Sequence, residues 1–413
     1  MMIDYDNFTG NFNFPAPENL TYLANCSAVG CSRLRQQNGP PYTELPSYIR
    51  ITATAVCAVI LAFGTVGNVL VATVVWKFKE LRNSTNLFLM NLSVADLLVL
   101  LVCVPPALVE LHSMPEVWLL GEGMCKAVPY VQLTAAHASI LTILAISFER
   151  YYAICEPLKA GYTCTQMRAL AIICIIWLVA ALLTSPVLMT IDYHMAEAMH
   201  DDTMVPVCLQ MVKELWQQLY YMSIIGFLFV IPFLVLLVVY CHIAKHLMLG
   251  RRVLASSSEE NQMRARKQVV FMLIAVVLSF FICLLPFRIF TVWMIITPQE
   301  EVTHLGMETF YSLLYFCRLL LYMNSAINPI LYNAISSKFR SCVMRLLRCS
   351  NVRSRLLSRQ ITKGTTTSST ATTSGSVKKD GTLLQHSSRQ LRVTVNSNCG
   401  WNAGEKVPKP ESV

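Results

Sequence analysis

The stretch that decides the fold is residues 51–76, which read ITATAVCAVILAFGTVGNVLVATVVW. These 26 positions contain no charged side chain. A helix needs about 20 consecutive apolar residues to cross the hydrocarbon core of a bilayer, because unpaired backbone groups cannot remain there. The stretch therefore predicts a membrane-spanning helix.

Six more stretches of this kind follow along the chain. They are expected at residues 85–111, 127–148, 169–191, 215–240, 269–287 and 307–332. Charged residues interrupt only two of them. The second span contains Asp96 and Glu110, and the seventh contains Glu308 and Arg318. The pattern predicts an all-α membrane protein, a seven-transmembrane helix bundle.

Charge is unevenly distributed along the 413 residues. Only 14% of the residues are charged, against about 25% in an average soluble domain. The net charge of +9 comes from residues 333–413, which hold 14 basic and 3 acidic residues. This composition excludes an ordinary soluble enzyme, a disordered protein and a small disulfide-rich module. Since the excess positive charge lies in the C-terminal tail, after seven membrane spans, nucleic acid is not an expected partner.

The basic residues of the short loops predict the orientation. Loops one, three and five are basic, whereas loops two, four and six are mostly acidic. The odd loops and the C-terminal tail are therefore expected in the cytoplasm, and the N-terminus outside the cell. Glycosylation triplets begin at Asn7, Asn19 and Asn25, which agrees with that orientation in the plasma membrane.

The chain is expected to divide into four parts. Residues 1–50 form a glycosylated extracellular N-terminus and residues 51–335 the bundle. Residues 336–348 form a short amphipathic eighth helix on anionic membrane lipid, and residues 349–413 a disordered cytoplasmic tail.

Modifications are expected on the cytoplasmic side. Cys342 and Cys349 lie beside basic residues after the last span, so they are candidate palmitoylation sites, with unmodified thiols as the alternative. The Ser/Thr-rich run at 365–374 offers sites to protein kinases, and phosphates there would reverse the local charge and recruit a partner with a basic face. A solvating linker is the alternative for this run.

Two cysteines are expected on the outer side of the membrane. Cys125 lies at the outer end of the third span and Cys208 in the loop before the fifth. Because both are in the oxidising compartment, we expect a disulfide that fixes this loop across the mouth of the bundle. Cys26 and Cys31 are a second candidate pair.

Asp96 is an acidic residue in the middle of a span. A charge there is costly unless it is paired or hydrated. We expect Asn68, Ser139, Asn324 and Asn328 to converge on it and to bind water or a sodium ion. Hydrogen bonds that only hold helices together are the alternative. No other cofactor or metal is expected.

One motif per span identifies the family that the chain resembles. In order, they are Gly67-Asn68-Val69, Leu92-Ser-Val-Ala-Asp96, Glu149-Arg150-Tyr151, Trp177, Pro232 with Tyr240, Phe280-Phe-Ile-Cys-Leu-Leu-Pro286 and Asn328-Pro-Ile-Leu-Tyr332. Over about residues 50–348 the chain resembles the rhodopsin-like G-protein-coupled receptors. Residues 83–86, 97–103 and 147–161 look like those of the arthropod ecdysis-triggering hormone receptors. These receptors belong to the branch that also holds the neuromedin U, thyrotropin-releasing hormone and ghrelin receptors.

The resemblance implies an activation switch at the inner end of the third span, in the motif that Tyr151 completes. Glu149 is expected to hold Arg150 at rest, until outward movement of the sixth helix frees Arg150 for the heterotrimeric G-protein. Tyr240 and Tyr332 are then expected to turn toward it.

Two prolines and one phenylalanine in the last two spans are expected to transmit that movement. Pro286 and Pro329 kink the sixth and seventh helices and supply hinges. Leu284 stands where most of the family has Trp, so Phe280 or Phe287 is expected to transmit ligand contact instead.

The outer half of the bundle is the expected ligand site. The seventh span has no Lys for retinal, and Gln132 stands where amine receptors have Asp. Residues of both charges and aromatic residues gather there instead. They are Glu110, Gln132, Phe287, Arg288, Tyr315, Arg318 and Tyr322.

Related receptors bind peptides that end in Pro-Arg-X-amide, so the resemblance implies an extracellular peptide hormone such as ecdysis-triggering hormone. We expect Glu110 to pair with the peptide Arg, while Arg318, Arg288 and Gln132 hold the amide carbonyls. An internal Glu110–Arg318 ion pair that only joins two helices is the alternative.

Other functions have weaker support. Within the family, the alternative is a neuromedin-U-like or thyrotropin-releasing-hormone-like receptor. Signalling mainly through Gq and calcium is expected from the resemblance alone. A secondary transporter would need repeated pairs of broken helices, and the chain has no catalytic motif, so an enzyme is not expected.

Overall fold

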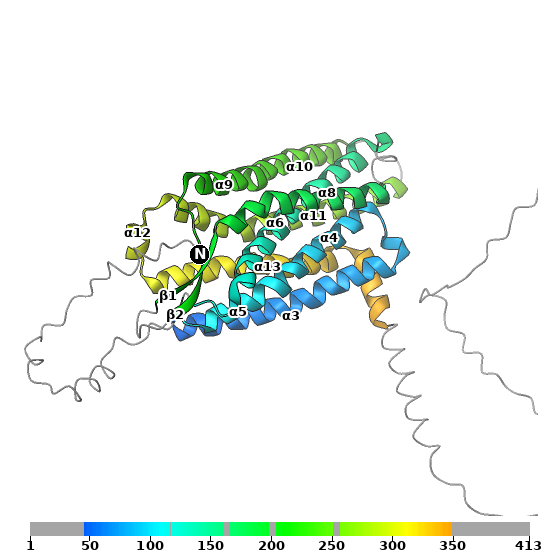
Figure 1. Cartoon of the computed structure of the whole chain (residues 1–413). Helices are drawn as coiled ribbons and strands as arrows, with labels where there is room; N and C mark the ends of the chain where they lie inside the picture. The colour runs from blue at the N-terminus through cyan, green and yellow to red at the C-terminus, as the bar shows by residue number, and fades with distance from the viewer. Residues whose placement is uncertain (1–44, 116, 160–164, 198–203, 251–256, 349–413) are drawn as a thin grey trace, which may run out of the picture. The chain divides into compact units, whose positions relative to one another are not determined.

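The computed structural model describes residues 45–115, 117–159, 165–197, 204–250 and 257–348. Within these residues, seven helical segments are long and apolar enough to cross a membrane (Figure 1). They run over Ser47–Lys77, Ser84–His112, Gly121–Cys155, Gln166–Met189, Leu215–Met248, Arg266–Ile296 and Met307–Ile335. The predicted seven-transmembrane bundle is confirmed.

The spans are built from labelled helices in chain order. They are α3 (Ser47–Lys77), α4 (Ser84–Leu98) with α5 (Val104–His112), α6 (Gly121–Cys155), α8 (Gln166–Thr184), α9 (Leu215–Ile225) with α10 (Ile231–Gly250), α11 (Ser257–Ile296) and α13 (Met307–Ile335). A short helix, α12 (Gln299–His304), precedes the last of them. Most helices extend past the predicted spans, because a helix continues into the membrane interface after its apolar stretch ends.

The fourth span is shorter than predicted at its end. It finishes in a 3-10 turn, Ser185–Met189, and Ile191 starts a strand instead of ending a helix. In a short stretch, apolar content alone cannot distinguish the end of a helix from the start of a strand.

Two spans contain a wide π turn that the sequence reading did not predict. The turns are Val99–Cys103, between α4 and α5, and Gly226–Val230, between α9 and α10. Proline follows each turn closely, at Pro105 and Pro232. Because proline has no N–H to donate, it interrupts the regular hydrogen-bond ladder of the helix. The first turn lies just before the half-helix that carries Glu110.

The seventh and first spans approach each other closely at a glycine. A Cβ added at Gly67 of α3 would lie 2.8 Å from the Cβ of Pro329 in α13. A Cβ at Gly64 would lie 2.8 Å from Leu100 Cδ1. Because the proline ring cannot move aside as the end of the Leu100 side chain can, glycine is required at position 67 for the first and seventh helices to pack at this distance.

The exposed surface of α3 is apolar and its buried side includes a polar residue. Phe63 and Trp76 are both 71% exposed, whereas Asn68 is fully buried. This distribution suits a helix that faces hydrocarbon on the outside and hydrogen-bonding partners on the inside.

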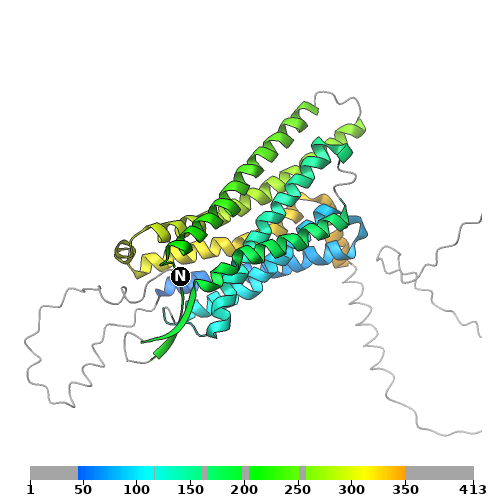
Figure 2. The same cartoon turned by 45° about the horizontal axis from the view of Figure 1, so that its top comes forward.

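A β-hairpin lies at one end of the bundle (Figures 1 and 2). Its strands, β1 (Ile191–Glu197) and β2 (Met204–Gln210), pair antiparallel with Tyr193 opposite Cys208. The predicted disulfide between Cys125 and Cys208 is present and joins β2 to α6 near the start of that helix. We call this the hairpin end of the bundle. The opposite end carries Arg150 near the end of α6 and is called the Arg150 end.

The chain divides into two units, Met1–Phe339 and Arg340–Val413. The backbone of residues 337–348 is helical, while its placement on a membrane surface stays a prediction. The glycosylation triplets at Asn7, Asn19 and Asn25, the Cys26 and Cys31 pair, Cys349 and the run at 365–374 lie outside the described residues.

Candidate functional site

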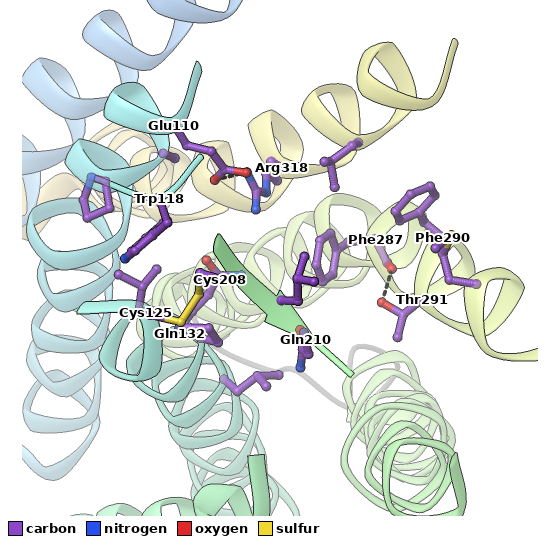
Figure 3. Close-up of a pocket in the computed structure, with 18 of the residues that line it drawn as sticks. Glu110, Trp118, Cys125, Gln132, Cys208, Gln210, Phe287, Phe290, Thr291 and Arg318 are labelled. Atoms are coloured by element: carbon purple, nitrogen blue, oxygen red, sulfur yellow. Dashed lines mark hydrogen bonds and ion pairs between the residues drawn. A yellow bond between two sulfur atoms is a disulfide. The ribbon is translucent and has the colours of Figure 1, made fainter. Parts of the chain in front are cut away.

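A cavity with a volume of about 160 Å³ lies at the hairpin end (Figure 3). Residues of α5, α6, α9, α11, α13 and β2 line it. In Figure 3 the β2 strand crosses the opening, held to α6 by the Cys125–Cys208 disulfide. A cavity between helices and under an anchored hairpin is a typical place for a ligand.

An ion pair lies on the wall of this cavity. Arg318 Nη1 donates to Glu110 Oε2 at 2.8 Å, and each side chain is 20% exposed. The Arg318 guanidinium also lies 5.8 Å from the centre of the Tyr315 ring. The internal pair between α5 and α13 is therefore present, and both of its members face the cavity.

Two other polar side chains of the cavity have no such partner. Arg288 of α11 lines it, is 8% exposed, and makes no hydrogen bond or ion pair within the described part of the chain. The side-chain amide of Gln132 in α6 also lines the cavity and makes no hydrogen bond with any described residue. These groups leave hydrogen-bond donors available to a ligand.

The structure brings six of the seven predicted ligand residues to the cavity. They are Glu110, Gln132, Phe287, Arg288, Arg318 and Tyr322. Tyr315 does not line it, because its buried ring stacks on Tyr311 of the same helix, with 6.4 Å between the ring centres.

The sequence reading missed other lining residues. Phe290, Thr291 and Met294 lie one and two turns after Phe287 in α11, so helical periodicity could have found them. Trp118 and Gln210 carried no comparable signal, since the hairpin and the loop before α6 position them. The backbone N–H of Trp118 donates to the carbonyl of Pro206 at 2.8 Å.

A smaller cavity, of about 20 Å³, surrounds Asp96. Ser139 and Asn324 also line it, and Asn328 Nδ2 donates to Asp96 Oδ2 at 2.9 Å. Asn68 does not line it, because its amide donates to the carbonyls of Gly64 and Ser325.

A cavity of this size has room for one water molecule or one small ion beside its polar lining groups. Its carboxylate, hydroxyl and amide oxygens are the ligand types that hard cations prefer. The Oδ1 atom of Asn324 is buried and has no hydrogen-bond partner among the described residues, so it is available to such an ion. The residues present therefore fit a sodium ion.

The Arg150 end contains a compact hydrogen-bonded network. The Glu149 carboxylate accepts hydrogen bonds from the hydroxyls of Ser84 and Thr85, the latter at 3.0 Å. Arg150 donates to Thr85, and its Nη2 atom lies 3.5 Å from Glu149 Oε1. The predicted contact between Glu149 and Arg150 is thus present, and the two α4 hydroxyls are additions that the sequence reading missed.

Three other tyrosines are expected to take part in the switch. Tyr240 shares a 3.0 Å hydrogen bond with Ser147, and Tyr151 packs against the buried apolar cluster that includes Ile154 and Ile243. The ring of Tyr332 packs on Phe339.

The predicted hinge and transmission residues lie in the sixth and seventh spans. Pro286 lies inside α11 and Pro329 inside α13. Phe280 is buried and lines the small cavity, together with Leu284.

Comparison with known proteins adds independent support for the family. The model of the family described as 7 transmembrane receptor (rhodopsin family) matches residues 67–332. A QRFP-like peptide receptor of Branchiostoma floridae is 35% identical over 307 residues, which are 72% of this chain and 78% of that protein. The human growth hormone secretagogue receptor type 1 is 34% identical over 313 residues, 73% of this chain and 82% of that protein.

The human thyrotropin-releasing hormone receptor is 29% identical over 344 residues, which are 77% of this chain and 83% of that protein. The predicted similarity to thyrotropin-releasing hormone receptors is thereby confirmed. With seven spans, the disulfide and the motif residues in place, the chain belongs to the rhodopsin family of seven-transmembrane receptors.

Proposed function

We propose that this chain is a plasma-membrane receptor for an extracellular peptide and that it activates a heterotrimeric G-protein. The observation that carries the proposal is the cavity at the hairpin end, with Glu110 and Arg318 on its wall. The names of several relatives, which are peptide or peptide-hormone receptors, support it. The hairpin end and the N-terminus would then face the outside of the cell, and the Arg150 end the cytoplasm. As a member of this receptor family, the chain is not an enzyme.

The narrower ligand that we propose is a peptide ending in Pro-Arg-X-amide, such as ecdysis-triggering hormone. The peptide Arg would replace Arg318 as the partner of Glu110. The released Arg318, with Arg288 and Gln132, would then bind the carbonyl oxygens of the peptide end, for which charge-assisted hydrogen bonds are suited. Signalling through Gq and calcium belongs to this proposal.

A thyrotropin-releasing-hormone-like ligand is the second candidate. It is favoured by the receptors of that name among the relatives, which are 28–31% identical to this chain. A neuromedin-U-like peptide belongs to the same amidated class and would use the same contacts.

Calcium release in cells that express the receptor tests the proposal against a panel of amidated peptides. We expect at least one Pro-Arg-X-amide peptide to be active. Glu110→Gln and Arg318→Ala should each lower its potency by about 10-fold or more, because each removes one charge-assisted contact.

The matched control is Glu122→Gln. Glu122 is an exposed acid at the same end and pairs with Lys126 at 2.5 Å, so its change should leave potency intact. Silence toward all the peptides, or unchanged potency of both cavity variants at normal surface expression, would contradict the proposal.

Three further proposals concern the remaining predicted partners. A sodium ion would bind at Asp96, held also by Ser139 and Asn324. Receptor kinases and arrestin would act on the tail at 365–374. Palmitoylation of Cys342 and Cys349, together with membrane lipid, would hold the segment 336–348 to the inner leaflet.

A further inference from the structure

The starting observation is a buried cation on the wall of the large cavity. The Arg288 side chain belongs to a residue that is 8% exposed, and it lines the cavity together with Gln132. Within the described part of the chain, neither side chain makes a hydrogen bond or an ion pair. A cation enclosed in a cavity without a charged partner is unfavourable, so an anion that enters the cavity would stabilise it.

The protein does not supply a compensating charge from the described residues of the cavity. Three charged side chains line it, Glu110, Arg288 and Arg318, which gives a net charge of +1. Glu110 is bonded to Arg318 at 2.8 Å. The positive charge that remains in the lining is that of Arg288.

Two side chains on other helices interact electrostatically with Arg288, and one of them, His137, has a buried Nε2 without a hydrogen-bond partner among the described residues. His137 of α6 and Tyr220 of α9 lie within electrostatic range of it. His137 Nδ1 shares a 2.9 Å hydrogen bond with Thr184, and the Tyr220 hydroxyl donates to the carbonyl of Leu183 at 2.9 Å. Neither side chain provides a negative charge.

We propose that Arg288 binds a small monovalent anion, chloride under physiological conditions, with the Gln132 amide as a second donor. The cavity of about 160 Å³ has room for an anion with water around it. Guanidinium and amide N–H groups are donors without an acceptor role, which suits an anion.

The proposal has a consequence for ligands, which rests on the proposed function. A carbonyl or carboxylate group of a peptide that reaches Arg288 would have to displace the anion. Chloride would then compete with the peptide and lower its apparent affinity.

The anion site itself can be tested without any peptide, so its failure would leave the proposed function unaffected. The thermal midpoint of the purified full-length receptor is measured while gluconate is replaced by chloride, at constant sodium and ionic strength. We expect a saturable rise of about 2 °C or more, since a ligand that binds the folded state stabilises it.

Two variants locate the site. Arg288→Gln should abolish the chloride response, whereas Arg168→Gln, at an exposed position of α8, should retain it. Glu110→Gln should strengthen it, because Arg318 then loses its carboxylate. The proposal would be overturned if the wild-type receptor showed no chloride response. It would also be overturned if the response survived unchanged in Arg288→Gln, and in either case water alone would solvate Arg288.

A direct measurement covers the case in which Arg288→Gln does not fold. Binding of radioactive chloride to the wild-type receptor is followed by scintillation proximity. One saturable site per receptor, displaced by bromide and not by gluconate, supports the proposal. Binding that rises linearly with concentration contradicts it.

Discussion

At the scale of single residues, one hydroxyl joins two opposite charges. Thr85 Oγ1 donates to the Glu149 carboxylate at 3.0 Å and accepts a hydrogen bond from Arg150. Glu149 is 7% exposed, so its contacts are not replaced easily by water. Thr85 therefore holds Arg150 in the position that the resemblance assigns to the resting receptor.

Thr85→Ala should raise signalling in the absence of ligand by up to about tenfold, because hydrogen bonds to charged groups contribute about 1.5–3 kcal/mol each. Basal second-messenger levels at matched surface expression measure this. Thr73→Ala is the control, since the exposed Thr73 donates to the carbonyl of Val69 in its own helix. Thr85→Ser should restore the basal level. A basal level that Thr85→Ala leaves unchanged would show that this hydroxyl does not restrain Arg150.

Asp96 supplies a second prediction at this scale. Sodium should raise the thermal midpoint of the purified wild-type receptor above its value in choline, because the ion binds only the folded site. Asp96→Asn should remove this difference. Asp192→Asn, at an exposed position of β1, serves as the control. A sodium response that persists in Asp96→Asn would place the ion elsewhere.

At the scale of helices, packing of α3 against α13 depends on glycine. The 2.8 Å distance between an added Cβ at Gly67 and Pro329 is shorter than two carbon atoms tolerate. Pro329 has a rigid ring, so it cannot move aside as a long flexible side chain would.

Gly67→Ala should therefore lower the free energy of unfolding by about 1–3 kcal/mol, the usual range for overpacking. Thermal denaturation of the purified receptor measures the change. Gly123→Ala is the matched control, because nothing lies within 4 Å of an added Cβ there and alanine favours helix. Equal midpoints for Gly67→Ala and the wild type would mean that the two helices are farther apart than described.

The helices could be predicted from hydropathy, but their internal irregularities could not. Long apolar stretches fix the number of spans because the bilayer core demands them. The π turn at Val99–Cys103 depends on how the chain accommodates Pro105 against its neighbours. The strand at Ile191–Glu197 likewise depends on pairing with a distant segment, so local sequence could not distinguish it from the end of a helix.

At the scale of the whole molecule, the sequence could predict most cavity residues that belong to helices. Glu110 and Arg318 were identified because charges in membrane spans are rare. Trp118 and Gln210 could not be identified, because their places follow from the loop and hairpin that cross the opening. Tyr315 lies outside the cavity lining because its ring packs on Tyr311, one turn earlier in α13, and the sequence alone cannot show that packing.

The central claim is that the receptor recognises a peptide cation through Glu110. A double-mutant cycle between receptor and peptide tests it directly. Concentration–response curves are recorded for the wild type and Glu110→Gln, each with an active Pro-Arg-X-amide peptide and with a copy in which citrulline replaces the Arg. The two changes remove the same contact from opposite sides.

The account predicts that each single change lowers potency by about 10-fold or more and that both together cost no more than one alone. If the two losses multiply instead, the peptide Arg and Glu110 act independently, and the proposed contact is wrong.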